Sequence, residues 1–86
     1  MSDHCITVYG LSTCGHCRHA RAFLEERNIP FTDVCVDNLV GDERAETIAM
    51  VKKLNPRVSF PTIVINGGEK VLVGFHEDEL EEALGL

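Results

Sequence analysis

Two cysteines separated by two residues, Cys14 and Cys17, lie between a segment with the composition of a strand and a segment with the periodicity of a helix. Residues 5–9 read Cys-Ile-Thr-Val-Tyr, a largely β-branched and aromatic run that Gly10 ends. In residues 15–27, apolar side chains recur at helical spacing and predict one buried face, made of Cys17, Ala20, Phe23 and Leu24. The sequence therefore predicts a strand–turn–helix unit with both thiols at the start of the helix.

The rest of the chain continues this alternation of strands and helices. Further strands are predicted at residues 31–36, 63–65 and 70–73, and Asn66-Gly67-Gly68 is a hairpin signal between the last two. A second helix is expected to begin with Asp42 as its cap, and a third covers residues 77–84. The predicted buried faces are Ala45, Ile48, Val51 and Leu54 in the second helix and Leu80, Ala83 and Leu84 in the third.

The predicted order of elements is β-α-β-α-β-β-α. Strands joined through a helix pair in parallel by a right-handed crossover, whereas a hairpin joins antiparallel strands. We therefore expect an α/β fold with a mixed four-stranded sheet and helices on both faces. At 86 residues, the chain is expected to form a single domain over residues 1–86.

Charge and composition argue against several classes of function. Eight basic and fourteen acidic residues give a net charge of −6, which disfavours non-specific binding to nucleic acids and to anionic membranes. No apolar run is long enough to cross a bilayer. The N-terminal Met1-Ser2-Asp3-His4 lacks the basic and apolar regions of a signal peptide. We expect a cytoplasmic monomer whose partners are neither nucleic acids nor membranes.

The start of the helix gives the two thiols different chemistry. Backbone N–H groups of the first turn and the helix dipole stabilise an anion, so the pKa of Cys14 is expected to fall below about 8.5. Arg18 supplies a positive charge and His16 a hydrogen-bond donor near the same thiolate. Cys17, one turn further in, is expected to be less exposed and more protonated. These differences predict that Cys14 attacks a disulfide and Cys17 resolves the mixed disulfide, with no bound cofactor.

Other interpretations of the cysteines stay open. A structural disulfide across a loop of about four residues constrains an unfolded chain little, and the cytosol reduces such bonds. Zinc held with the help of His16 and His19 lacks the second close pair of ligands that such sites need. Cys5 and Cys35 are expected to be buried free thiols, with a disulfide between them as the alternative if the first two strands are neighbours.

Three stretches carry a resemblance to a known family: Tyr9 to Cys17, Ser59 to Thr62 and Val73 to His76. They resemble the glutaredoxins of the thioredoxin-like superfamily, and the likeness covers essentially the whole chain. The resemblance implies a thioredoxin-like fold and a thiol–disulfide oxidoreductase. It also implies a cis bond before Pro61, which lets backbone groups of Phe60 pair with an extended substrate. The substrate or glutathione groove that it implies consists of Thr13, His16, Arg57, Phe60, Pro61 and Gly74, with Arg57 able to hold the glycyl carboxylate.

Departures from the family pattern leave the electron donor open. Glutathione-dependent members commonly have a lysine where this chain has Leu11 and a tyrosine where it has His16. Gly74-Phe75-His76 is closer to the small redoxins that serve ribonucleotide reductase and draw electrons from thioredoxin reductase. The expected donor is therefore glutathione or a thioredoxin-reductase-type flavoenzyme. The expected partner is a disulfide-containing protein or a glutathionylated substrate. Further candidates for a glutathione-carboxylate site are Arg21, Lys52 and Lys53.

A function of another class is also open. Some glutaredoxins bridge a [2Fe–2S] cluster between two chains, through the first cysteine of each chain and two glutathione molecules. Gly15, in place of the more usual proline, leaves the active-site loop freer and is compatible with such a carrier. In that alternative, Cys14 is the protein ligand and binds the cluster together with glutathione.

Overall fold

A mixed four-stranded sheet is the centre of the computed structural model, which describes residues 5–85. Its strands are β1 (Ile6–Gly10), β2 (Thr32–Cys35), β3 (Thr62–Ile65) and β4 (Lys70–Val73). They lie in the order β2-β1-β3-β4. β1 pairs with β2 in parallel, and the β1–β3 and β3–β4 pairs are antiparallel. The predicted element order and mixed sheet are therefore confirmed, and so is the hairpin at residues 66–68.

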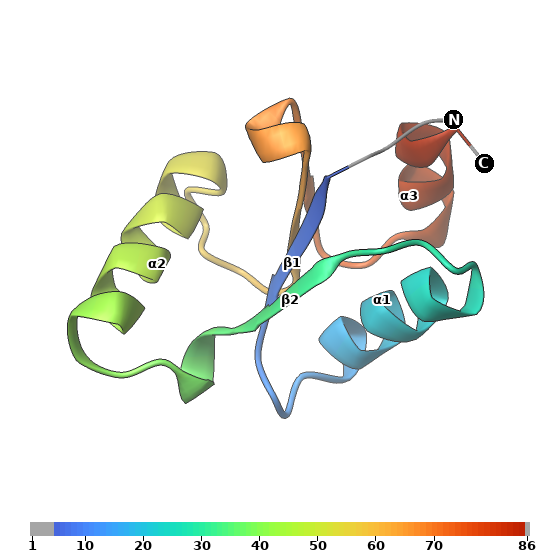
Figure 1. The fold of residues 1–86 in the computed structure, drawn as a ribbon. Coiled ribbons are helices and arrows are strands. Elements are labelled where there is room, and N and C mark those ends of the chain that lie inside the picture. The colour runs from blue at the N-terminus through green and yellow to red at the C-terminus, as the bar shows by residue number, and fades with distance from the viewer. Residues whose placement is uncertain (1–4, 86) are drawn as a thin grey trace.

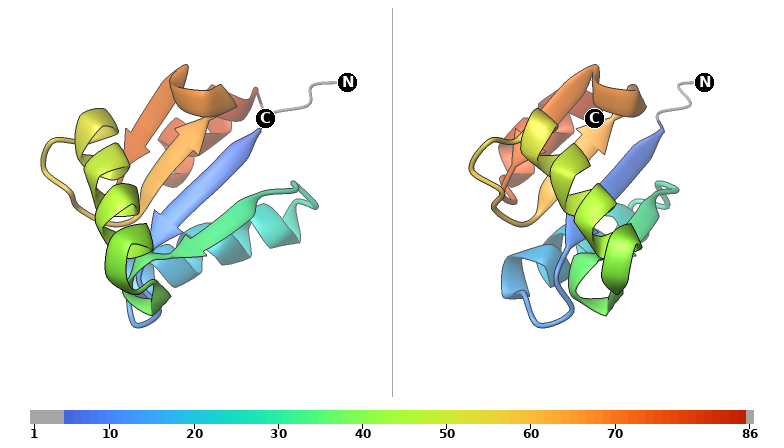
Figure 2. Two further views of the ribbon diagram at one scale, coloured as in Figure 1. Left: turned by 60° about the vertical axis from the view of Figure 1, so that its left-hand side comes forward. Right: turned by 90° about the vertical axis from the view of Figure 1, so that its left-hand side faces the viewer.

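Helices cover both faces of the sheet, as predicted: α1 (Gly15–Glu26), α2 (Gly41–Leu54) and α3 (Glu77–Leu84). α2 lies on one side of the sheet, and α1 and α3 lie on the other (Figure 1), an arrangement that the turned views also show (Figure 2). Two short 3₁₀ helices, η1 (Val36–Asn38) and η2 (Asn66–Gly68), follow β2 and β3. Within residues 5–85, no helix is both long and apolar enough to cross a membrane.

Each face of the sheet has its own apolar core, because successive side chains of a strand point to opposite faces. The larger core lies under α1 and α3 and contains Ile6, Val8, Ala20, Phe23, Leu24, Ile63, Ile65, Leu80 and Leu84. The smaller core lies under α2 and contains Tyr9, Val36, Val51 and Val64. The predicted buried faces of α1 and α3 are thus confirmed, with Ala83 partly buried against the larger core.

α2 departs from its prediction in two respects. Its N-cap is Val40, which makes no side-chain capping bond, and Asp42 lies in the first turn instead. The carboxylate of Asp42 is still near the positive end of the helix dipole, where it is favourable. In the predicted apolar face, Val51 is buried, Ile48 and Leu54 are partly buried, and Ala45 is exposed. The prediction for Ala45 was wrong because α2 packs on the small core through its second half, which leaves its first turns in solvent.

Candidate active site

One row of backbone positions crosses the sheet where β1 leads into α1. The parallel pairing places Cys35 beside Gly10, and the antiparallel pairing of Tyr9 with Thr62 places Pro61 on the other side of Gly10. Gly74 completes the row, since its N–H donates to the Pro61 carbonyl at 2.8 Å. The three stretches that carried the resemblance therefore meet at one end of the sheet, next to the cysteine pair.

Cys14 is the N-cap residue of α1. Its backbone is extended (φ −82°, ψ 119°), and its Sγ accepts a hydrogen bond from the Cys17 N–H at 3.3 Å. Its carbonyl accepts the first intrahelical bond from the Arg18 N–H at 3.1 Å. Cys14 is partly exposed, whereas Cys17 has no exposed surface. The two sulfurs thus differ as predicted: one faces the free N–H groups of the helix and reaches solvent, and the other is enclosed.

The surroundings of the two thiols shift their pKa values in opposite directions. Burial acts to raise the pKa of Cys14, but hydrogen bonds from the Cys17 side chain and backbone and from the His16 backbone outweigh it. Together with the charge of Arg21, these bonds lower the pKa of Cys14 below its ordinary value. Burial and the hydrogen bond with Cys14 raise the pKa of Cys17 to about 11. At neutral pH, Cys14 is therefore the better nucleophile of the pair.

Gly10 lets β1 pass directly against the buried thiol. A Cβ atom on Gly10 would lie 2.8 Å from Cys17 Sγ, closer than Cβ atoms approach other atoms in proteins, and 3.0 Å from Cys17 Cβ, which is also unusually tight. The absence of a side chain at Gly10 is therefore what allows Cys17 to be enclosed between the strand and the helix.

The cation beside the thiols differs from the predicted one. Arg18 is exposed, and the positive charge that acts on both thiols is that of Arg21. Arg21 follows Cys17 by four residues and so shares its helix face. Its Nη1 lies 3.3 Å from Asp33 Oδ1 on β2. The side chain of His16 is exposed, and its backbone N–H is the group that acts on the Cys14 thiol.

A carboxylate from η1 holds the loop that precedes Cys14. Asp37 accepts bonds from the Ser12 N–H at 3.0 and 3.3 Å and from the Ser12 hydroxyl at 2.6 Å. These hydrogen bonds lower the pKa of Asp37, although the carboxylate is fully exposed. The contact joins residues 25 positions apart in the sequence, and no local motif signals it.

A buried amide organises the loop between α2 and β3. The side chain of Asn55 donates to the Ser59 carbonyl, the Ser59 hydroxyl and the Thr62 hydroxyl at 3.3, 3.2 and 3.1 Å. Its oxygen accepts from the Arg57 N–H at 3.2 Å, and Asn55 is only 2% exposed. In the sequence, Asn55-Pro56 indicated only the end of a helix. In the structure, Asn55 shapes the loop that carries Arg57 and leads to the Phe60–Pro61 bond, which is cis as expected.

The remaining predicted groove residues lie around this end of the sheet with different exposures. Thr13 and Arg57 are exposed, Phe60 is partly buried against the smaller core, and Pro61 is buried. Gly74 has a left-handed backbone (φ 82°), which suits glycine. Strand pairing thus places Pro61 and Gly74 beside the cysteine pair, and the part of all these residues in substrate binding stays a prediction.

Cys5 and Cys35 do not form the disulfide considered above. Cys35 pairs with Gly10, whereas Cys5 precedes the opposite end of β1, about five residues or 16 Å away along the strand. Disulfides need Cα atoms within about 7 Å. Both thiols are free; Cys35 is partly buried, and the expectation that Cys5 is buried was wrong, since the strand begins only after it.

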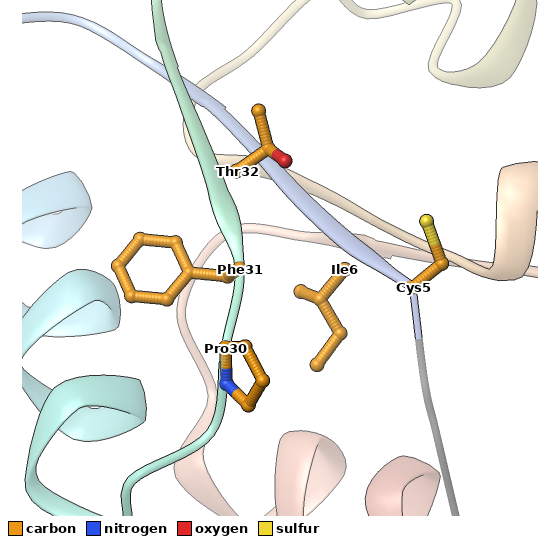
Figure 3. A pocket seen from close by; sticks show the side chains of 5 residues that line it. All are labelled: Cys5, Ile6, Pro30, Phe31 and Thr32. Carbon is orange, nitrogen blue, oxygen red and sulfur yellow. The ribbon is translucent and has the colours of Figure 1, made fainter.

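A pocket of about 230 Å³ lies at this distant end of β1 and β2, away from the cysteine pair. Its lining is largely apolar and consists of Cys5, Ile6, Pro30, Phe31 and Thr32 (Figure 3). Within residues 5–85, no group of three His, Cys, Asp or Glu side chains is arranged to hold a metal ion.

Comparison with known proteins identifies the family. The sequence matches the glutaredoxin family over residues 6–69. The chain belongs to the glutaredoxin family. The glutaredoxin of Methanosarcina mazei Go1 is 43% identical, with a TM-score of 0.88, over 95% of this chain and 79% of that one. Methanosarcina acetivorans methanoredoxin is 42% identical, with a TM-score of 0.88, over 94% of this chain and 84% of that one. Glutaredoxin 1 of Rickettsia felis is 28% identical over 83 residues, which are 94% of this chain and 81% of the relative.

The family and the structure confirm two of the main expectations. The fold is the thioredoxin-like fold of the glutaredoxins. The protein is a thiol–disulfide oxidoreductase.

Proposed function

We propose that this glutaredoxin reduces disulfides of proteins, or mixed disulfides of glutathione, by a dithiol mechanism in which Cys14 attacks and Cys17 resolves. The observation that carries the proposal is the contrast between the two sulfurs. Cys14 Sγ is partly exposed at the helix N-cap, where the Cys17 N–H donates to it. Cys17 is fully buried one turn deeper.

The reaction takes two exchange steps. The Cys14 thiolate attacks one sulfur of the substrate, a mixed disulfide forms, and the other substrate sulfur leaves as a thiolate that takes up a proton. Cys17 then loses its proton and attacks Cys14 Sγ. The second substrate sulfur leaves and takes up a proton, and Cys14 and Cys17 remain joined. Two electrons have passed from the protein to the substrate.

Substrate positioning is assigned to the residues around the Cys14 loop. Within residues 5–85, the backbone N–H and carbonyl of Phe60 have no hydrogen-bond partner and are available to an extended peptide. Thr13, His16, Pro61 and Gly74 border the same end of the sheet. Arg57 is exposed, and its cation suits a substrate carboxylate such as that of glutathione.

Trapping tests the assigned roles. With a disulfide substrate, Cys17→Ser is expected to accumulate the mixed disulfide on Cys14, which mass spectrometry detects, and Cys14→Ser is expected to form none. Cys5→Ser is the matched control and is expected to turn over normally, since Cys5 lies at the opposite end of the sheet. Trapping on another cysteine, or full activity of Cys14→Ser, would refute the mechanism.

The electron donor is proposed to be glutathione or a thioredoxin-reductase-type flavoenzyme. Reduction of the oxidised protein is measured side by side with NADPH, glutathione reductase and glutathione, and with NADPH and thioredoxin reductase. Fast reduction by glutathione assigns the glutathione route despite Leu11, and reduction only by the flavoenzyme assigns the other route. Reduction by neither contradicts both donor assignments. No observation on the described residues favours the iron–sulfur carrier.

A further inference from the structure

We propose that Arg21, held in place by Asp33, is the residue that stabilises negative charge on both active-site sulfurs in turn. The inference rests on the roles proposed for Cys14 and Cys17, and it adds a residue outside the cysteine motif. Arg21 acts through its charge, so its role is electrostatic and positional.

The geometry brings the guanidinium to the buried thiol. A Cβ atom on Gly10 would lie 2.8 Å from Cys17 Sγ and 3.6 Å from Arg21 Nη1. Both atoms therefore converge on the space that the missing Gly10 side chain leaves open. Arg21 is placed there by helix geometry, because it follows Cys17 by four residues on the face that packs against the sheet.

Asp33 fixes the same nitrogen. Asp33 pairs with Val8, whose side chain lies in the core under α1, so the carboxylate is on the α1 face of β2. Its Oδ1 lies 3.3 Å from Arg21 Nη1, and the two side chains are 37% and 16% exposed. The low exposure of Arg21 matters, because solvent and salt screen a charge less when it is partly buried. An exposed, unanchored arginine at this position would have a weaker effect on the sulfurs.

Other titratable groups surround the pair and have to be separated from Arg21 in a test. On β2, Cys35 Sγ lies 4.0 Å from Asp33 Oδ2. On η1, Asp37 is bonded to Ser12. On α1, His16 and Arg18 have exposed side chains. Arg21 differs from Arg18 because its side chain is partly buried and forms an ion pair with Asp33.

Its charge serves both exchange steps. In the reduced protein, the charge of Arg21 acts to lower the pKa of Cys14 and also that of Cys17, although burial keeps the pKa of Cys17 above its ordinary value. In the mixed disulfide, Cys14 carries no charge, and the guanidinium then favours the Cys17 thiolate that must form. Cys17 loses a proton to solvent, its sulfur bonds to Cys14 Sγ, and the departing substrate sulfur takes up a proton, so charge and electrons balance.

Titration of the thiols by alkylation tests the inference on the intact protein. The rate at which iodoacetamide modifies Cys14 is followed by peptide-resolved mass spectrometry from pH 5 to 10, which separates Cys14 from Cys5 and Cys35. Arg21→Gln is expected to raise the midpoint by about half a pKa unit, a threefold loss of rate below the midpoint. With Cys17 present, release of the substrate thiol from the mixed disulfide on Cys14, followed by stopped-flow, is expected to slow about threefold. Arg21→Lys keeps the charge and is expected to recover most of both effects.

Arg27→Gln is the matched control. Arg27 caps the other end of α1 and also takes part in ion pairs, with Glu77 and Glu81. It is about 20 Å from Cys14 along the helix, more than twice the screening length of about 8 Å in physiological salt. Its removal is expected to leave the midpoint unchanged. The same midpoint in Arg21→Gln and Arg27→Gln, with both variants folded by circular dichroism, would overturn the inference. Titration needs no turnover, so this failure is distinct from activity persisting in Cys14→Ser.

Discussion

Replacing Gly10 with alanine places a methyl group where β1 passes over the buried thiol. The new carbon would lie 2.8 Å from Cys17 Sγ and 3.0 Å from Cys17 Cβ. Cys17 cannot easily move away from the added methyl group, because Cys17 and Ala20, one turn further along α1, are both fully buried. Overpacking of this kind typically costs 1–3 kcal/mol, so we expect a loss of about 2 kcal/mol in the free energy of unfolding. In a domain of this size that loss lowers Tm by about 10 °C.

The assay is urea unfolding of the reduced protein, followed by circular dichroism. Gly15→Ala is the matched control, since a Cβ on Gly15 meets nothing within 4 Å and alanine is the better helix former. Repeating Gly10→Ala in a Cys17→Ala background removes the sulfur from the contact. The cost of the methyl group is then expected to fall by about 1 kcal/mol, a coupling typical of residues in contact. Equal effects in both backgrounds, or a Gly10→Ala variant as stable as Gly15→Ala, would refute the packing argument.

Three further predictions concern the thiols and the two loops that flank them. With rising pH, iodoacetamide is expected to modify Cys14 first and Cys17 only near pH 11, as peptide mass spectrometry can show; a reversed order contradicts the assignment. Hydrogen bonds from Ser12 lower the pKa of Asp37 below 3.8 in the folded protein. These bonds therefore stabilise the fold above about pH 3.8, and the stabilisation is lost as the pH falls further and the carboxylate is protonated. The free energy of unfolding, measured between pH 2 and 6, should show the loss of this contribution on acidification in the wild type and not in Asp37→Asn. Asn55→Ala leaves buried polar groups unpaired and is expected to lower the free energy of unfolding, measured with urea, by about 2 kcal/mol. A change under about 0.5 kcal/mol would contradict this role of Asn55.

The order of the elements and the cysteine motif were predictable because both are local. Strand composition, helical spacing and turn residues act within a few positions of one another, and so does the effect of the α1 N-terminus on Cys14. Spacing also gave the buried faces of α1 and α3 correctly. It failed for Ala45, because no local pattern shows how far a helix extends past the core on which it packs.

The contacts that position the site were not predictable from local pattern. Sequence distance to Cys14 indicates Arg18 as the nearby cation, but a residue four positions after an N-cap can face solvent, as Arg18 does. Arg21 was the better choice on geometric grounds, since it lies one turn after Cys17 on the packed face. Its pairing with Asp33 depends on where β2 lies, and only the tertiary fold sets that position.

Two polar side chains outside the cysteine motif now explain how the site keeps its shape. Asp37 ties the loop before Cys14 to η1, and Asn55 ties the loop before Pro61 to the start of β3. Neither side chain is among the groups that shift the pKa of Cys14 or Cys17. We therefore expect these two side chains to act on the shape of the loops and not on the pKa values of the thiols. Substitutions at Asp37 or Asn55 should change how a substrate is presented to Cys14 and leave the thiolate itself intact, whereas changes at Arg21 should do the reverse.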